Sequence, residues 1–107
     1  MADHTFLFTD LEGSTALWDE HPGAMQDALA HHDALLRAAV ADAGGRVVKE
    51  MGDGLYAVLP SPTAAVAAAV AALRALASEG WGATGPLRAR LGIGVGEAEA
   101  RDDDWFG

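Results

Sequence analysis

The chain has 107 residues, half of them hydrophobic, which is enough for one small domain with its own core and argues against disorder. Sixteen acidic and seven basic residues give a formal net charge of −9, which argues against nucleic acid and anionic membrane surfaces as partners. There is no cysteine, so disulfides and thiolate metal sites are excluded.

The sequence shows no signal peptide and no membrane-spanning segment. Residues 1–4 contain no basic region followed by an apolar stretch. The longest apolar run, 64–73, is mostly alanine and is too short to cross a bilayer. Together with the lack of cysteine, these features predict a cytoplasmic domain without membrane contact.

The first expected element is a strand that ends in a carboxylate. The Phe-Leu-Phe run at 6–8 predicts a strand buried on both faces, and Asp10 follows at its C-terminal end. A Gly-Ser-Thr turn at 13–15 can then open a short helix over 14–20. A carboxylate beside free N–H groups at a helix start suits a divalent metal that carries a phosphate. The structural alternative is that Asp10 caps a turn and one of the hydroxyls caps the helix.

Five further elements are expected along the chain. They are a helix over 24–43 that ends at Gly44-Gly45, strands over 46–51 and 55–59, a helix over 62–78 that begins after Ser61, and a strand over 87–98. A Gly52-Asp53-Gly54 turn joins the two middle strands into a hairpin. Helical spacing predicts buried stripes of Met25, Leu29, Leu35, Leu36 and Val40 in one helix and of Val66, Val70, Leu73 and Leu76 in the other.

Two local features resemble binding motifs but lack the required spacing. Gly92, Gly94 and Gly96 do not form the G-x-G-x-x-G turn of dinucleotide-binding proteins, and no helix follows them. We expect them in a strand that packs closely against another part of the protein. His31 and His32 have no partner at a metal-binding spacing, so they are expected to be structural or solvent-facing.

The order strand, helix, strand, strand, helix, strand predicts an α+β fold with a ferredoxin-like βαββαβ core. Right-handed crossovers place the third strand between the first and second, antiparallel to both. Asp10 then lies at the sheet edge where the hairpin turn holds Asp53. Two such carboxylates repel each other unless they are protonated or bridged by cations, so a pair of Mg²⁺ ions acting at phosphorus is one interpretation. The other is that Asp53 simply fills a turn position that favours aspartate.

Four separated segments resemble the class III adenylate/guanylate cyclase catalytic domain of bacterial type. They are Phe8-Thr9-Asp10-Leu11-Glu12-Gly13-Ser14-Thr15, Lys49-Glu50-Met51-Gly52-Asp53-Gly54, Arg90-Leu91-Gly92-Ile93-Gly94-Val95-Gly96-Glu97 and Asp104-Trp105-Phe106-Gly107. They agree with the family in order and spacing and cover essentially the whole chain.

This resemblance implies a site for ATP and two Mg²⁺ or Mn²⁺ ions. The implied metal ligands are Asp10, Asp53 and the Leu11 carbonyl, the implied triphosphate turn is Gly13, Ser14 and Thr15, and the implied adenine-reading residues are Lys49 and Asp104. A lysine that donates to N1 and a carboxylate that accepts from the 6-amino group match adenine, whereas guanine has the opposite polarity there. Without the resemblance, Lys49 is a solvent-facing strand residue and 102–104 a solvated acidic loop.

The resemblance further implies a head-to-tail homodimer with shared active sites. Lys49 and Asp104 of one chain would serve Asp10 and Asp53 of the other, and ATP would give 3′,5′-cyclic AMP and pyrophosphate. Such bacterial domains are often fused to regulatory or ATPase modules.

The sequence departs from the family at its end. Residues 1–107 are interpreted as a single, C-terminally incomplete cyclase domain, because the family's later helix with a ribose-orienting asparagine and a charge-stabilising arginine is not present. Loss of one donor aimed at developing charge typically costs about 10²–10³ in rate, so this chain alone is expected to be weak or inactive. One alternative is a degenerate nucleotide-binding or regulatory dimerisation module without catalysis. Another, a diguanylate cyclase, lacks support because 51–55 does not supply the required Gly-Gly-Asp/Glu-Glu-Phe turn.

Overall fold

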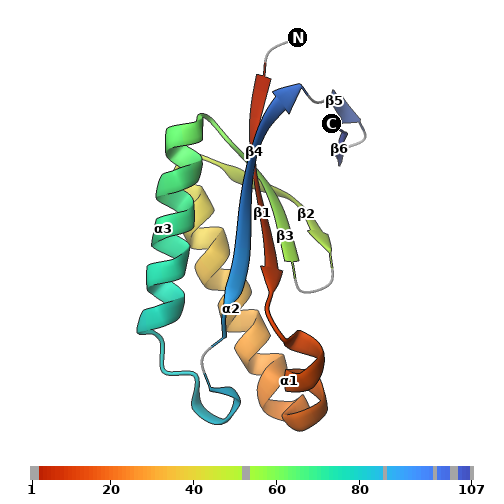
Figure 1. Ribbon diagram of the computed structural model, residues 1–107, viewed down its shortest axis with the longest axis vertical. Helices are drawn as coiled ribbons and strands as arrows, with labels where there is room; N and C mark the ends of the chain where they lie inside the picture. The colour runs from red at the N-terminus through yellow and green to blue at the C-terminus, as the bar shows by residue number, and fades with distance from the viewer. Residues whose placement is uncertain (1–2, 52–53, 86, 98, 102–103, 107) are drawn as a thin grey trace.

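Four strands pair into one antiparallel sheet with the order β2-β3-β1-β4 in the computed structural model (Figure 1). The structure describes residues 3–51, 54–85, 87–97, 99–101 and 104–106. The elements are β1 (Asp3–Leu11), α1 (Ser14–Glu20), α2 (Pro22–Asp42), β2 (Arg46–Met51), β3 (Gly54–Leu59), α3 (Pro62–Ser78), the 3₁₀ turn η1 (Gly82–Thr84), β4 (Ala89–Glu97), β5 (Glu99–Arg101) and β6 (Asp104–Phe106).

This topology confirms the ferredoxin-like βαββαβ core. The third strand lies between the first and second and is antiparallel to both, as right-handed crossovers require. The small second sheet, β5 with β6, is not predicted from the sequence. Its strands have three residues each, too few for an alternating pattern to be recognised.

Helices α2 and α3 cover one face of the sheet. Leu7 of β1 is fully buried on this face, in a cluster with Val40 of α2 and with Ala65 and Ala68 of α3. Side chains alternate along a strand, so the even-numbered residues of β1 point to the opposite face. We call that opposite face, which carries Phe6, Phe8, Asp10, Tyr56 and Arg90, the open face.

The prediction that the opening strand is buried on both faces holds at Phe6 and Leu7, which are 6% and 1% exposed, but not at Phe8. Phe8 is 41% exposed, because neither α2 nor α3 reaches the open face. The aromatic rings on this face pack mainly on one another: the Tyr56 ring centroid lies 4.6 Å from that of Phe8 and 5.4 Å from that of Phe6. The hydrophobic run at 6–8 therefore places side chains in two different environments, the core under the helices and the open face.

The predicted buried stripe of α3 is wrong at three of its four positions. Val66, Val70 and Leu73 are 54%, 40% and 47% exposed, and only Leu76 is buried as expected. The buried positions are instead the alanines Ala65, Ala68 and Ala72. Each alanine lies one or two residues from a predicted position, and each residue turns the helix by about 100°. The small alanine side chains let α3 pack close to the sheet and to α2.

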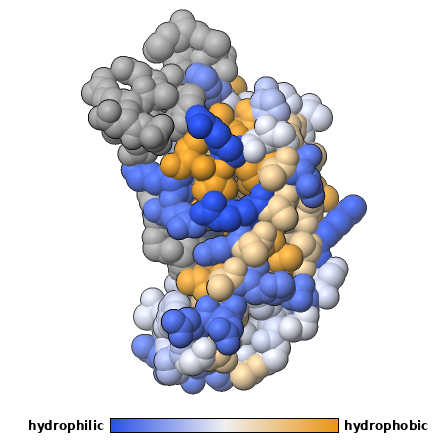
Figure 2. Space-filling view, turned by 180° about the vertical axis from the view of Figure 1, so that it is seen from behind, coloured by the Kyte–Doolittle hydropathy of each residue, from blue (hydrophilic) through white to orange (hydrophobic). Residues whose placement is uncertain are grey.

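Helix α2 follows the sequence more closely. Met25, Leu36 and Val40 are buried as predicted, whereas Leu29 and Leu35 are only partly buried. Its outward surface carries the exposed alanines Ala30, Ala34, Ala38 and Ala41. Seen from this side, a mildly apolar band crosses the surface between hydrophilic side chains (Figure 2). Of the helices that the structure describes, none is long and apolar enough to cross a membrane.

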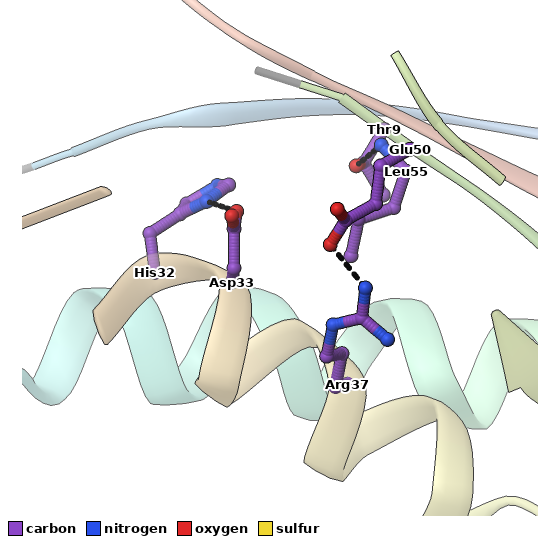
Figure 3. Close-up of polar contacts among 6 residues, drawn as sticks. All are labelled: Thr9, His32, Asp33, Arg37, Glu50 and Leu55. Atoms are coloured by element: carbon purple, nitrogen blue, oxygen red, sulfur yellow. Dashed lines mark hydrogen bonds and ion pairs between the residues drawn. The ribbon is translucent and has the colours of Figure 1, made fainter. Parts of the chain in front are cut away.

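The two histidines of α2 have different environments. His32 is fully buried, with Nδ1 3.0 Å from Oδ1 of Asp33 (Figure 3). His31 is exposed, with Nε2 2.9 Å from Oε1 of Glu79. One is therefore structural and the other solvent-facing, the two environments expected from the sequence.

The glycines of β4 lie on the open face, and the expected close packing is wrong for the described residues. A Cβ atom added at Gly92 or Gly96 would meet nothing within 4 Å. At Gly94 the nearest atom is Cε2 of Phe8 at 3.7 Å, an ordinary contact distance. These glycines leave the middle of the open face flat.

Candidate functional site

The end of β1 presents a carboxylate on the open face. Asp10 lies directly opposite Arg90 of β4, and Nη2 of Arg90 forms an ion pair with Oδ2 of Asp10. Both side chains are at least half exposed. Asp10 is therefore accessible, and its partner is a cationic side chain rather than the backbone of a turn.

A buried hydrogen bond holds the end of β1 beside the start of β3. The backbone N–H of Leu55 donates to Oγ1 of Thr9 at 2.9 Å (Figure 3). The strand pairing of Phe8 with Tyr56 immediately precedes this bond. Asp53, which the sequence expects to meet Asp10 here, lies outside the described residues, but the first residue of β3 follows it directly.

The Leu11 carbonyl points toward the same edge. The N–H of Glu12 donates to the carbonyl of Arg88 at 2.8 Å, so it faces β4. The described peptide bonds include no cis bond, and in a trans peptide the carbonyl and the following N–H point in opposite directions. The carbonyl of Leu11 is therefore directed away from β4, to the β3 side of β1.

The turn after β1 has a conformation that favours glycine. Gly13 has φ 69° in the left-handed region and precedes α1, and no side chain caps this helix. The hydroxyls of Ser14 and Thr15 thus do not act as the cap, which was the structural alternative. A hollow of about 280 Å³ is lined by Glu12, Gly13, Ala16, Leu17 and Arg88.

Lys49 lies on the open face because β2 contains an irregularity. The register shifts between Val47 and Lys49, so that Val48 is an extra residue and Lys49 pairs with Tyr56. In a regular strand Lys49 would pair one residue further along and point to the opposite face. Glu50 points instead to the helix side, where it forms an ion pair with Arg37 of α2 (Figure 3).

Asp104 begins β6, and its side chain is not among those described. The strand itself contacts β2, which carries Lys49. The structure thus brings the backbone element of Asp104 near that of Lys49. Among the residues that the structure describes, no three His, Asp or Glu side chains gather into a metal-binding cluster.

A cavity of about 460 Å³ lies between α3 and the beginning of β4, with Leu73, Leu76, Leu87 and Ala89 in its wall, and neither Asp10 nor Lys49 lines it. Arg90 is a charged neighbour of Asp10 that sequence reasoning did not single out. Only the strand register could have found it, because 80 positions separate the two residues.

Comparisons with known proteins agree on one family. A model described as "Adenylate and Guanylate cyclase catalytic domain" matches residues 1–101. A receptor-type adenylate cyclase of Trypanosoma congolense is 44% identical over 78 residues, which are 73% of this chain and 10% of that protein. A solved adenylate cyclase structure from Trypanosoma brucei superimposes with a TM-score of 0.91 at 27% identity and covers 98% of this chain and 63% of that one.

A solved adenylate/guanylate cyclase/hydrolase from Silicibacter pomeroyi has a TM-score of 0.80 at 27% identity, with 99% of this chain and 63% of that chain covered. The chain spans only 5% to 13% of the length of the first curated relatives that it matches.

Proposed function

The chain belongs to the adenylate and guanylate cyclase catalytic domain family, and from this premise we propose that it forms the metal-binding and adenine-reading part of an adenylate cyclase. The reaction converts ATP to 3′,5′-cyclic AMP and pyrophosphate. The observation that carries the proposal is that Asp10 and Lys49 point to the same face of the sheet, the open face, which neither α2 nor α3 covers. The names of the curated relatives, which are adenylate cyclases, favour ATP over GTP.

We infer that Asp10, Asp53 and the Leu11 carbonyl would hold two Mg²⁺ or Mn²⁺ ions. The donor set fits, because carboxylate and carbonyl oxygens are the ligands that these cations prefer. The directions of the Asp10 side chain and the Leu11 carbonyl support it: the first already faces a positive group, and the second points to the edge where β3 begins. When bound, such a metal pair lowers the barrier to attack of the ribose 3′-hydroxyl on the α-phosphorus.

The remaining residues of the site bind and orient the nucleotide. Lys49 would donate to N1 of adenine, and Asp104 would accept from the 6-amino group. The contact of β6 with β2 supports this pairing. Backbone N–H groups of Gly13, Ser14 and Thr15 would hold the triphosphate, which the uncapped start of α1 supports.

We propose that the site is shared in a head-to-tail homodimer. Strand spacings of about 4.8 Å across a sheet and 3.4 Å along a strand place the Cα atoms of Lys49 and Asp10 of one chain roughly 12 Å apart. Because neither α2 nor α3 covers the open face and Phe8 on it is 41% exposed, a second chain has access to both. In the dimer, Lys49 and Asp104 of one chain read the base held over Asp10 and Asp53 of the other.

The test is cyclic AMP production with Mg²⁺ and with Mn²⁺, using the longest chain that the gene encodes around these residues. Asp10→Ala should abolish the product, whereas Arg37→Gln, which alters a surface ion pair on the other side of the sheet, should leave it unchanged. Nucleotide binding without any product would instead support a regulatory module without catalysis.

The shared site has its own test. Mixing an Asp10→Ala chain with a Lys49→Ala chain should restore some activity, because one of the two sites in a mixed dimer then contains both residues. Absence of rescue, once mixed dimers are demonstrated, would mean that each chain uses its own lysine.

A further inference from the structure

We propose that Arg90 is an internal counter-ion that competes with divalent metal for the Asp10 carboxylate. The inference rests on the proposed function, because it assigns to Arg90 a regulatory role at the same site. Nη2 of Arg90 lies on Oδ2 of Asp10, one of the two carboxylate oxygens available to a metal ion.

The strand pairing places the Arg90 and Asp10 side chains next to each other. Asp10 and Arg90 are directly opposite each other in the β1–β4 pairing and point to the same face of the sheet. Directly opposed residues of an antiparallel pair have Cβ atoms about 5 Å apart, so the guanidinium reaches the carboxylate without any change in the strands. A guanidinium placed on one carboxylate oxygen occupies the space and balances the charge that would attract a metal ion.

The contact is also weak enough to be exchanged. The side chains of Arg90 and Asp10 are 67% and 50% exposed, and ion pairs in such positions contribute little to stability. A metal ion that binds through several oxygens can displace the arginine, but its affinity is lowered by the contact that it replaces. Arg90 therefore weakens metal binding at Asp10, and the metal binds tightly only when further ligands, such as a nucleotide phosphate, bind together with it.

The experiment measures Mn²⁺ binding to the chain in the absence of nucleotide, by electron paramagnetic resonance of free Mn²⁺. Arg90→Gln should tighten the Asp10-dependent binding by a factor of about two to five, the range set by the strength of exposed ion pairs. Arg88→Gln is the matched control, because it removes the same charge from an exposed position two residues away. Arg90→Lys should retain most of the wild-type affinity, since the positive charge remains. Circular dichroism verifies that each variant is folded.

The outcomes separate this inference from the proposed function. If Asp10→Asn weakens Mn²⁺ binding but Arg90→Gln behaves like Arg88→Gln, the metal site stands and the competition is refuted. If Mn²⁺ binding does not depend on Asp10 in either the wild type or Arg90→Gln, both ideas fail. Binding that appears only in Arg90→Gln supports the competition strongly.

A measurement on the wild-type chain needs no variant. The Nε–H resonance of Arg90 should shift as Mg²⁺ is added, with the same midpoint as Mg²⁺ binding, because the guanidinium leaves the carboxylate. An unchanged resonance at saturating Mg²⁺ would overturn the proposal.

Discussion

The hydrogen bond between Thr9 and Leu55 gives the sharpest test of how the site is held. Thr9 is 8% exposed and Leu55 is 3% exposed, so the N–H of Leu55 has no ready access to water. Thr9→Val keeps the shape of the side chain but removes the acceptor oxygen. A buried donor left without a partner costs about 1–3 kcal/mol. This loss is well below the total stability of a typical domain, about 5–15 kcal/mol, so the variant should fold.

The assay combines chemical denaturation with amide hydrogen exchange. Thr9→Val should lower the free energy of unfolding by about 1–3 kcal/mol, which corresponds to a fall in melting temperature of at least about 4 °C. Exchange at the Leu55 amide should increase more than exchange in α3, because the lost bond is local. Thr9→Ser is the control: it retains the acceptor and should retain protection at Leu55. A Thr9→Val variant with wild-type stability and unchanged exchange at Leu55 would refute the reasoning.

Two further predictions concern the packing of α3 and the irregularity in β2. Ala68→Leu should destabilise the protein by about 1–3 kcal/mol, because the position is only 1% exposed. Val66→Ala, at a position that is 54% exposed, should change the free energy of unfolding by less than about 0.5 kcal/mol. Denaturation curves that show the two effects reversed would mean that α3 packs by its larger residues. Deletion of Val48 should leave Lys49 opposite Tyr56, since the extra residue is removed and the flanking pairs keep their register. Cross-strand nuclear Overhauser effects test this, and pairing of Lys49 with any other residue of β3 would contradict it.

Element positions could be predicted from the sequence because local signals mark them. Strand β2 and helix α3 have the predicted bounds, 46–51 and 62–78, since glycines precede the first and a Ser-Pro pair begins the second. The strand order also followed, because crossover handedness leaves few arrangements of six elements. These signals need no knowledge of which side chains meet.

The packing faces could not be predicted in the same way. In α3, valine and leucine positions compete with alanine positions for the same interface, and hydrophobicity favours the larger side chains. The interface instead uses Ala65, Ala68 and Ala72, since close approach of the helix depends on small size as well as on apolarity. Phe8 shows the converse: a large apolar residue stays exposed because nothing in the described part of the chain covers its face.

The candidate site likewise has one part that the sequence predicts and another part that depends on strand pairing. The sequence placed Asp10 at the end of the first strand, and the structure has it there, on an accessible edge. The ion pair with Arg90 and the orientation of Lys49 depend on registers between distant segments, one of which contains a shift of a single residue. A local pattern contains no information about such a shift, because each strand looks regular when read alone.

The strand registers also change the expectation of how this acidic chain would attract an anionic nucleotide. Composition alone suggests that phosphates are attracted only through metal ions or backbone dipoles, because the net charge is −9. Yet Arg46, Lys49 and Arg90, three of the seven basic residues, all point to the open face by their strand pairing. The glycines of β4 leave that face flat, so these charges are close to anything that lies on it. The open face therefore combines local positive charge with the Asp10 carboxylate, and this combination supports the proposal that a metal-bound triphosphate binds there.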